Sequence, residues 1–147
     1  MLADAPGADR ALRLWLITIG EPLPIEPGSR ALRTRILASR LVERGADVLW
    51  WTSDFNHFSK QRHETGGIEV ATDEGYRLRF VHGWAYQRNL SLSRQLNHIE
   101  IARDFVRQAA TLERPDVIIC SFPSIELAAK AAQYAKRSGA RFILDVR

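Results

Sequence analysis

The stretch Leu12-Arg13-Leu14-Trp15-Leu16-Ile17-Thr18-Ile19 (LRLWLITI, residues 12–19) decides the fold class. It is almost continuously apolar, and its length suits a β-strand buried on both faces, as strands of parallel sheets are. Similar apolar runs follow at 47–52 (DVLWWT), 117–120 (VIIC) and 142–146 (FILDV). The sequence therefore predicts a sheet of mostly parallel strands.

The segments between these runs carry helical patterns. A helix is predicted from Ser29, which suits an N-cap, to Gly45, with apolar residues at helical spacing: Leu32, Ile36, Leu37 and Leu41. A longer helix is expected over 91–113, with one apolar stripe widened by two further residues: Leu92, Leu96, Ile99, Val106 and Ala109, then Ile101 and Phe105.

The remaining pattern completes an α/β chain. A third helix is expected from its cap Ser124, through Glu126 in the first turn, to Gly139. A hairpin is expected over 67–82, with 73–75 (DEG) as its turn. This order of elements predicts a Rossmann-like, doubly wound, mostly parallel sheet with helices on both faces and one hairpin.

Length and composition indicate one globular domain. The chain has 147 residues, of which 46% are apolar and 26% charged. Residues 1–11 are rich in Ala, Asp, Gly and Pro and are expected to form a flexible tail, which leaves 12–147 as the domain. No apolar run approaches the roughly 20 residues that span a bilayer. The single cysteine, Cys120, excludes an internal disulfide and fits a reducing compartment, so we expect a cytoplasmic protein.

The charge balance is compatible with two interpretations. The net charge of +4 favours partners that carry phosphate or anionic lipid, but a solvated basic face explains it equally well. Arg33, Arg40 and Arg44 fall on one face of the first helix, and this face is either solvated or binds an anionic surface such as membrane phosphates. Arg30 differs, because it is expected in the first helical turn, where a helix N-terminus and an arginine together bind anions. Nucleic acid is not expected, since no aromatic ladder or recognition motif accompanies the charge.

Several classes of site are excluded by the motifs. The segment 20–24 (GEPLP) follows the first apolar run where a dinucleotide-binding fold would have GxGxxG, and its prolines lack N–H donors. An NAD or FAD site is therefore not expected. The chain has no GxxxxGK[ST], HExxH or paired CxxC, so neither a P-loop nor a metal site is expected.

Nucleophile motifs are also incomplete. Ser121 and Ser124 follow a predicted strand, but Gly-x-Ser-x-Gly is absent, which argues against a serine hydrolase. Cys120 ends an apolar run and is expected to be a small buried hydrophobe. His57 and His63 share one polar loop without a third ligand, a pattern typical of ordinary polar residues.

Ligands of doubly wound sheets bind at the carboxyl ends of the strands. This rule nominates the segments 20–30, 53–63 and 121–124, together with whatever follows Val146. The sequence stops where the last strand would enter a functional loop, so we expect it to be part of a longer protein.

The assembled residues resemble the N-terminal domain of family 4 glycosyltransferases of the GT-B fold, over residues 12–147. The similarity is to bacterial members that add sugars to lipid-linked carriers in O-antigen or capsule synthesis. The matching segments, in order, are 29–33 (SRALR), 37–41 (LASRL), 45–48 (GADV), 52–57 (TSDFNH), 86–91 (YQRNLS), 115–119 (PDVII), 121–124 (SFPS) and 143–147 (ILDVR), the last resembling the start of a signature that continues Asp-x-Trp-Pro.

The resemblance implies the acceptor-binding half of a retaining glycosyltransferase, which moves a sugar from a nucleotide-sugar to a glycan acceptor, expected to be lipid-linked. The donor-binding domain is absent, so the chain alone is not expected to catalyse transfer. No cofactor or metal is implied, and no catalytic residue is assigned. The acceptor-binding candidates are Gly20, Glu21, Gly28, Ser29, Arg30, Asn56, His57, Ser121 and Ser124, and the interdomain cleft is expected to be bordered by Asp145 and Arg147.

The chain departs from the family at 20–28, where prolines replace the glycines that many members carry, and this leaves the acceptor open. The alternative function is a non-enzymatic α/β module that docks on anionic membrane or phosphate ligands. Either function is compatible with peripheral contact at the inner face of the plasma membrane.

Overall fold

The computed structural model describes residues 10–56, 61–62, 68–83, 92–121 and 124–146. The helices are α1 (Arg33–Glu43), α2 (Leu92–Ala109) and α3 (Ile125–Ser138). The strands are β1 (Arg13–Ile17), β2 (Asp47–Ser53), β3 (Phe55–Asn56), β4 (Gln61–Arg62), β5 (Glu69–Ala71), β6 (Arg77–Val81), β7 (Val117–Ser121) and β8 (Arg141–Asp145).

The strands form a doubly wound sheet, which confirms the predicted fold class. Its order is β5-β6-β2-β1-β7-β8, and every neighbouring pair is parallel except β5 with β6. β5 and β6 form the predicted hairpin. The chain winds outward from β1 in one direction through β2 and in the other through β7 and β8, so the topological switch point lies between β1 and β7.

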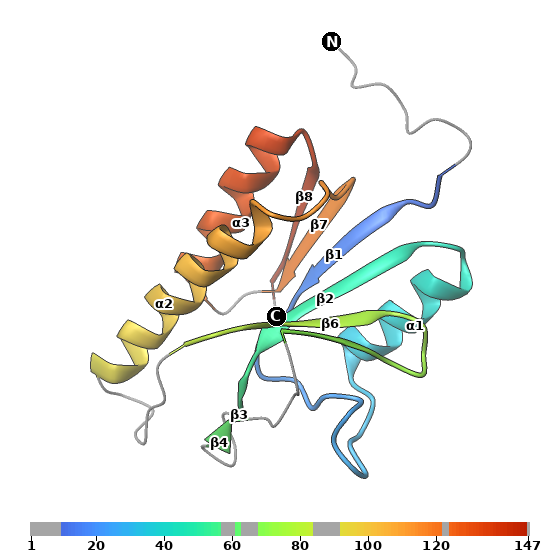
Figure 1. Ribbon diagram of the computed structural model, residues 1–147, viewed down its shortest axis with the longest axis horizontal. Coiled ribbons are helices and arrows are strands. Elements are labelled where there is room, and N and C mark those ends of the chain that lie inside the picture. Colours follow the sequence, from blue (N-terminus) through green and yellow to red (C-terminus); the bar gives the residue numbers. More distant parts are fainter. Residues whose placement is uncertain (1–9, 57–60, 63–67, 84–91, 122–123, 147) are drawn as a thin grey trace.

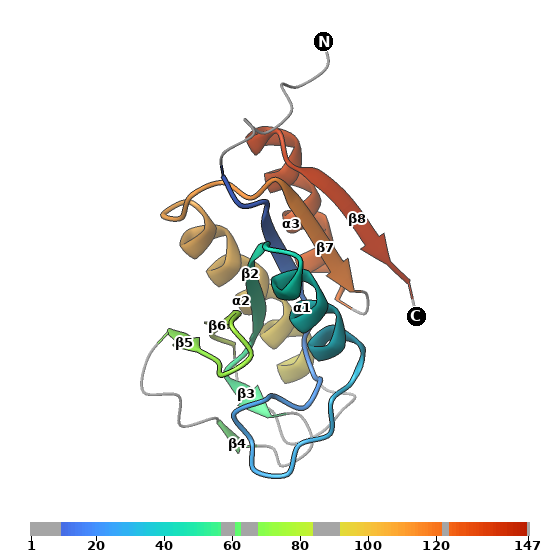
Figure 2. The ribbon, with the colours of Figure 1, turned by 90° about the vertical axis from the view of Figure 1, so that its right-hand side faces the viewer.

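Helices cover both faces of this sheet. α1 lies on one face, and α2 and α3 lie side by side on the other (Figures 1 and 2). Alternate residues of the strands therefore enter two separate cores. Trp15 and Trp51 pack with Phe105 under α2 and α3, whereas Trp50 and Tyr76 pack under α1.

The predicted apolar stripe of α1 is mostly wrong, because of its members only Leu41 packs against the core. The side chains of α1 that are fully buried are the small residues Thr34 and Ala38, whereas Ile36 is 53% exposed. The large rings of Trp50 and Tyr76 rise from the sheet and fill the space beneath the helix. The helix therefore lies over the rings with its small residues, while Ile36 and Leu37 turn outward.

The stripe predicted for α2 is only partly correct. Ile101, Phe105 and Ala109 are buried, but Leu92, at 86%, and Leu96, at 45%, are exposed. The buried face also holds polar residues with structural partners. Asp104 accepts the backbone N–H of His82 at 2.8 Å, and Gln108 donates to the carbonyl of Phe80 at 3.0 Å. These bonds satisfy backbone groups at the end of β6.

α3 begins and ends as predicted. The Ser124 hydroxyl accepts the N–H of Leu127, Glu126 lies in the first turn, and Gly139 ends the helix with φ of 78°. None of the helices in the described part of the chain is both long and apolar enough to cross a membrane. The short pair β3–β4 lies within the segment predicted to be a polar loop.

Candidate functional site

Polar side chains gather where β1, β7 and β8 end, on the face covered by α1. Ser121 and Asp145 are register partners at the ends of β7 and β8. Thr18 follows β1, whose last residue Ile17 is the register partner of Cys120 in β7. Thr18, Ser121 and Asp145 therefore lie side by side at the carboxyl edge, next to the topological switch point.

These residues belong to a continuous chain of contacts, here called the polar row, with the order Glu21, Thr34, Thr18, Ser121 and Asp145. The oxygen–oxygen distances along it are 2.8 Å from Glu21 to Thr34, 3.0 Å to Thr18, 3.2 Å to Ser121 and 3.2 Å to Asp145. The row thus connects two carboxyl groups through three hydroxyl groups.

Glu21 anchors one end of the polar row and also caps α1. Its carboxylate accepts the backbone N–H of Thr34 at 3.1 Å, although the two residues are 13 positions apart. The capping residue Leu32 offers no side-chain cap, so Glu21 stabilises the helix N-terminus instead. Leu23, only 1% exposed, fixes the loop that carries Glu21 in the core under α1.

The prediction that Ser29 caps α1, with Arg30 in its first turn, is wrong. The helix begins at Arg33, and Arg30 is exposed three residues before it. Ser29 instead accepts from the Arg35 guanidinium, with its hydroxyl and its carbonyl oxygen both at 3.3 Å. The N-terminus of α1, where an anion site was predicted, instead binds the carboxylate of Glu21.

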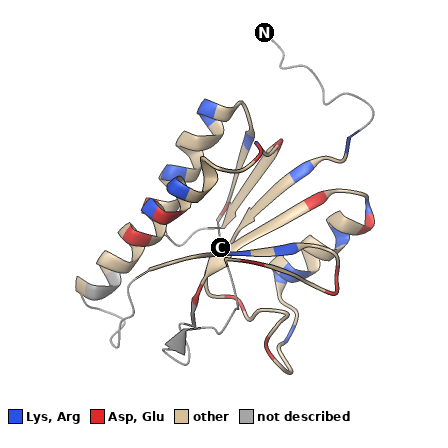
Figure 3. Cartoon of the chain, in the orientation of Figure 1, with Lys and Arg blue, Asp and Glu red and all other residues tan. Residues whose placement is uncertain are grey.

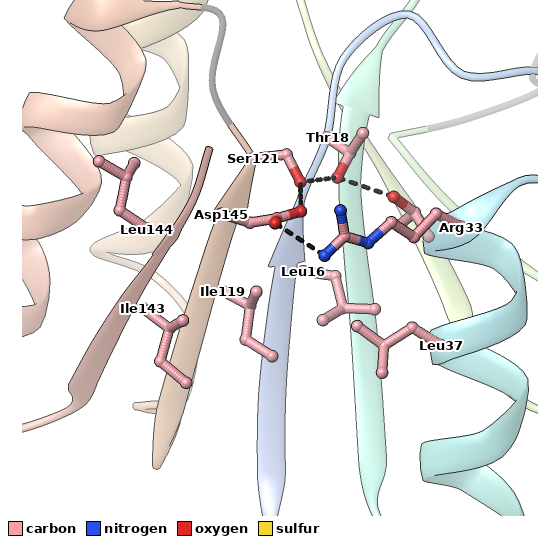
Figure 4. Close-up of a pocket in the computed structure, with 10 residues that line it drawn as sticks. Leu16, Thr18, Arg33, Leu37, Ile119, Ser121, Ile143, Leu144 and Asp145 are labelled. Carbon is pink, nitrogen blue, oxygen red and sulfur yellow. Dashed lines mark hydrogen bonds and ion pairs between the residues drawn. The ribbon is translucent and has the colours of Figure 1, made fainter. Parts of the chain in front are cut away.

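Arg33 closes the other end of the polar row. Its guanidinium lies 2.9 Å from the Asp145 carboxylate, so an ion pair bridges α1 and β8 (Figure 4). Below this pair a groove of about 180 Å³ opens between α1 and the strands β1, β7 and β8. Its floor and wall are apolar and consist of Leu16, Leu37, Ile119, Ile143 and Leu144. Its upper end is polar and consists of Thr18, Arg33, Thr34, Ser121 and Asp145.

The polar row presents hydroxyl and carboxylate groups to the groove. Each hydroxyl donates one hydrogen and can also accept, whereas a charged carboxylate only accepts. Of these groups, the hydroxyls of Thr18, Thr34 and Ser121 and the carboxylate of Asp145 line the groove.

The structure brings together three of the predicted site residues: Glu21, Ser121 and Asp145. Ser124 is employed as the α3 cap. Gly20 and Gly28 have positive φ values, 91° and 69°, and serve the turns of the first loop. Asn56 lies in β3, but its side chain is outside the described residues, as are His57 and Arg147 entirely.

Three residues of the site were not singled out by sequence reasoning as candidates for this edge. Thr18 could have been found from the sequence, because it is a polar residue at the end of an apolar strand. Thr34 lies within a helix among apolar and charged residues and carries no such signal. Arg33 was assigned to a solvated or anion-binding face, but its ion pair with Asp145 places it at the groove. A second polar pair at the same edge was also missed, in which His82 Nδ1 lies 2.7 Å from Asp54 Oδ2.

Several basic residues of the described chain form ion pairs with acidic ones. Lys and Arg occur near Asp and Glu on the helices and on the strands (Figure 3). In α1, Arg35 pairs with Glu74, and Arg40 pairs with Glu43. These ion pairs reduce the charge that α1 offers to an anionic partner.

Cys120 belongs to the core under α2 and α3, as expected from the sequence. Burial raises the pKa of its thiol to about 12, so the thiolate needed for nucleophilic chemistry is strongly disfavoured. Within the described ranges, no cluster of three or more His, Cys, Asp or Glu side chains is arranged to hold a metal ion.

No protein-family model matches the chain. No curated protein shows significant sequence similarity to it either.

Proposed function

We propose that the chain is the acceptor-binding half of a retaining glycosyltransferase, and that the groove beside the polar row holds a hydroxyl-bearing acceptor. The sugar would come from a nucleotide-sugar bound by a second domain. One observation carries this proposal: the polar row and its groove lie at the carboxyl edge of a doubly wound sheet, next to its topological switch point.

The chemistry of the groove suits a carbohydrate. Sugar hydroxyls both donate and accept hydrogen bonds, so they match the hydroxyl and carboxylate groups at the upper end of the groove. The apolar floor of Leu16, Ile119 and Ile143 suits the C–H face of a sugar ring or an aliphatic chain next to it. At about 180 Å³ the groove is smaller than the roughly 300–1,000 Å³ of an enclosed ligand pocket, and so matches one end of an acceptor.

Transfer requires the acceptor oxygen to be held in a fixed direction relative to the donor sugar. The polar row is suited to this task, because its hydroxyls come from different strands and a helix that pack on a common core. Rigid elements hold a site more precisely than a loop does. In this mechanism the chain orients the acceptor hydroxyl, and the donor domain stabilises the departing diphosphate.

The test is binding of methyl glucoside, methyl galactoside and methyl mannoside to the ¹⁵N-labelled chain, followed by NMR. We expect shifts at the amides of Thr18, Thr34 and Ser121. Ser121→Ala should weaken the tightest of these ligands about threefold to tenfold, the value of one neutral hydrogen bond. Ser138→Ala is the matched control, because its hydroxyl serves only the end of α3 at the carbonyl of Ala135.

Two results would count against the proposal. The first is an absence of glycoside-induced shifts at the polar row at millimolar concentrations. The second is salt-sensitive binding to phosphatidylglycerol vesicles without any effect of glycosides, which would favour the membrane-docking module. Inorganic phosphate serves as the anionic control, and we expect it to leave the Thr34 amide unshifted.

A further inference from the structure

We propose that β8 pairs with β8 of a second copy of this chain, antiparallel and centred on Ile143, and that this contact joins the two sheets edge to edge. The inference goes beyond the proposed function, because it concerns a protein partner and holds whether or not the groove binds a glycoside. It begins from the position of β8 in the sheet.

β8 presents one edge to solvent. It is the outermost strand of the described sheet, and Figure 2 shows it at the edge of the molecule. Arg141 donates its N–H to the carbonyl of Asp116, just before β7, at 2.9 Å. Backbone groups of successive strand residues point to opposite sides, so those of Arg141 and Ile143 point to β7. Those of Phe142 and Leu144 point outward, where they can pair with a further strand.

The sequence of β8 (RFILD) is complementary to itself in the antiparallel direction. With Ile143 opposite Ile143 of the partner subunit, Phe142 lies opposite the partner subunit's Leu144, and the two residues exchange both backbone hydrogen bonds. Arg141 then lies opposite the partner subunit's Asp145, which adds a cross-strand pair of opposite charges. Each pair forms twice, because a two-fold axis passes through the centre of the contact.

One register fits better than its neighbours. A shift by one residue places outward backbone groups opposite groups that already face β7, and loses the hydrogen bonds. A shift by two residues restores them but places either Arg141 or Asp145 opposite Ile143, so the charge pairs are lost. The register centred on Ile143 is therefore the one that satisfies both the backbone and the side chains.

The other edge of the sheet lacks this complementarity. β5 has only three residues, and pairing it with itself around Val70 places Glu69 opposite Ala71. Glu69 is already bonded to Arg77 at 3.0 Å and to Arg79 at 2.8 Å. The dimer contact is therefore assigned to β8 and not to β5.

The side chains of β8 are exposed as such a contact requires. Ile143 is 49% exposed, Leu144 is 46% exposed, and Arg141 is also exposed. The contact is only one strand wide, which is small for a stable dimer, so we expect a reversible dimer with a dissociation constant of roughly 10–100 μM.

The second copy also reaches the groove. The two-fold axis is perpendicular to the joined sheet, so the α1 faces of both copies lie on the same side. Ile143 and Asp145 line the groove. Ile143 of the partner subunit therefore extends its apolar floor, and Arg141 of the partner subunit lies beside Asp145 at its polar end.

The first test is sedimentation equilibrium of the chain at pH 7, from about 10 μM to about 1 mM. We expect the mass to rise from 16.7 kDa toward twice that value. Ile143→Lys and Ile143→Glu each place two like charges face to face at the centre and should weaken the dimer at least about tenfold. An equal mixture of the two variants should dimerise again, because the charges are then opposite.

Ile36→Lys is the matched control for these variants. Ile36 is 53% exposed, close to the exposure of Ile143, but lies on α1 and away from the edge of the sheet. The same substitution there should leave the dimer unchanged.

The second test measures the register by cross-linking, with oxidised glutathione as the oxidant. In Ile143→Cys the two new thiols face each other with Cα atoms about 4.5 Å apart, within the range of a disulfide. In Leu144→Cys, a control of similar exposure, the two thiols are diagonal neighbours with Cα atoms about 7–8 Å apart, beyond that range. We expect Ile143→Cys to form the covalent dimer at least about tenfold faster on a non-reducing gel. The unchanged protein, with its buried Cys120, is the blank.

Three outcomes would overturn the inference. The first is an unchanged protein that remains at 16.7 kDa at about 1 mM. The second is a dimer that survives in both Ile143→Lys and Ile143→Glu, which places the contact on another surface. The third is equal cross-linking of Ile143→Cys and Leu144→Cys, which decides the register even if the charged variants do not fold. Glycoside binding by a protein that remains monomeric would refute the dimer and leave the proposed function standing.

Discussion

Asp116, which precedes β7, binds Arg10 and the start of β1 at the edge of the sheet where the parallel strands begin. Its carboxylate accepts from the Arg10 guanidinium at 2.6 and 2.9 Å, and from the backbone N–H of Arg13 at 2.8 Å. The hydrogen bond from Arg10 is the main cause that lowers the pKa of Asp116 from its ordinary value, and the Arg13 N–H adds to it. Arg10, which belongs to the predicted tail at 1–11, is therefore bound to the domain through Asp116.

A pH dependence of stability follows from this carboxylate. Because its folded-state pKa lies below the unfolded value of about 3.9, its stabilisation is present above that value and is lost as pH falls through the folded-state pKa. Asp116→Asn should lower the free energy of unfolding at pH 7 by about 1–2 kcal/mol. The difference in the free energy of unfolding between the variant and the unchanged protein should narrow below about pH 4.

Urea unfolding at several pH values measures this difference. Asp73→Asn is the control, because Asp73 is exposed in the turn between β5 and β6 and should show little change. A difference between Asp116→Asn and the unchanged protein that stays constant down to pH 2 would contradict the interpretation.

At the scale of elements, strands were easier to predict than helix faces. An apolar run such as 12–19 buries both sides of its strand wherever it lies in a parallel sheet. A helix, by contrast, buries whichever face fits the space left by the sheet. The rings of Trp50 and Tyr76 leave room for Ala38 but not for Ile36, and hydrophobic spacing alone does not contain this information.

The same reasoning explains how much of the site was predictable. The rule for strand ends nominated the segments that hold Glu21 and Ser121, and the structure places both residues in the polar row. The N-cap of α1 was predicted three positions early, at Ser29 instead of Leu32, because a side-chain cap was sought next to the helix. The actual cap is a carboxylate 13 residues away from Thr34, and such a contact is set by the loop and not by local spacing.

The cap of α3 gives a prediction about one element. Ser124→Ala removes the oxygen that accepts the Leu127 N–H and should lower the free energy of unfolding by about 1 kcal/mol. Thermal or urea unfolding measures the effect, and Gln133→Ala, at an exposed position in the middle of α3, should leave stability nearly unchanged. Equal effects of the two substitutions would contradict the capping role.

At the scale of the whole molecule, the two cores share a single sheet and should unfold together. Leu78, which is 0% exposed, lies with Trp50 in the core under α1, whereas Trp15 and Trp51 lie in the core on the other face, so tryptophan fluorescence reports on both cores. Leu78→Ala should cost about 2–5 kcal/mol, the usual range for a buried leucine. The loss should appear equally in tryptophan fluorescence and in far-ultraviolet circular dichroism.

Ile143→Ala is the comparison, because Ile143 is 49% exposed on the floor of the groove and its truncation should cost less than about 1 kcal/mol. Both variants are measured by urea unfolding. Separate midpoints for fluorescence and circular dichroism in Leu78→Ala would contradict a single cooperative transition.

The position of β8 has a consequence for how the protein behaves in concentrated solution. β8 is the outermost strand of the described sheet, and two of its apolar residues, Ile143 and Leu144, are about half exposed. Such a strand invites pairing with the same strand of another molecule, and repulsion between like-charged molecules opposes this. The net charge of +4 at pH 7 vanishes near the isoelectric point of about 9.7, so colloidal stability should be best in neutral or mildly acidic buffer and poorest in alkaline buffer.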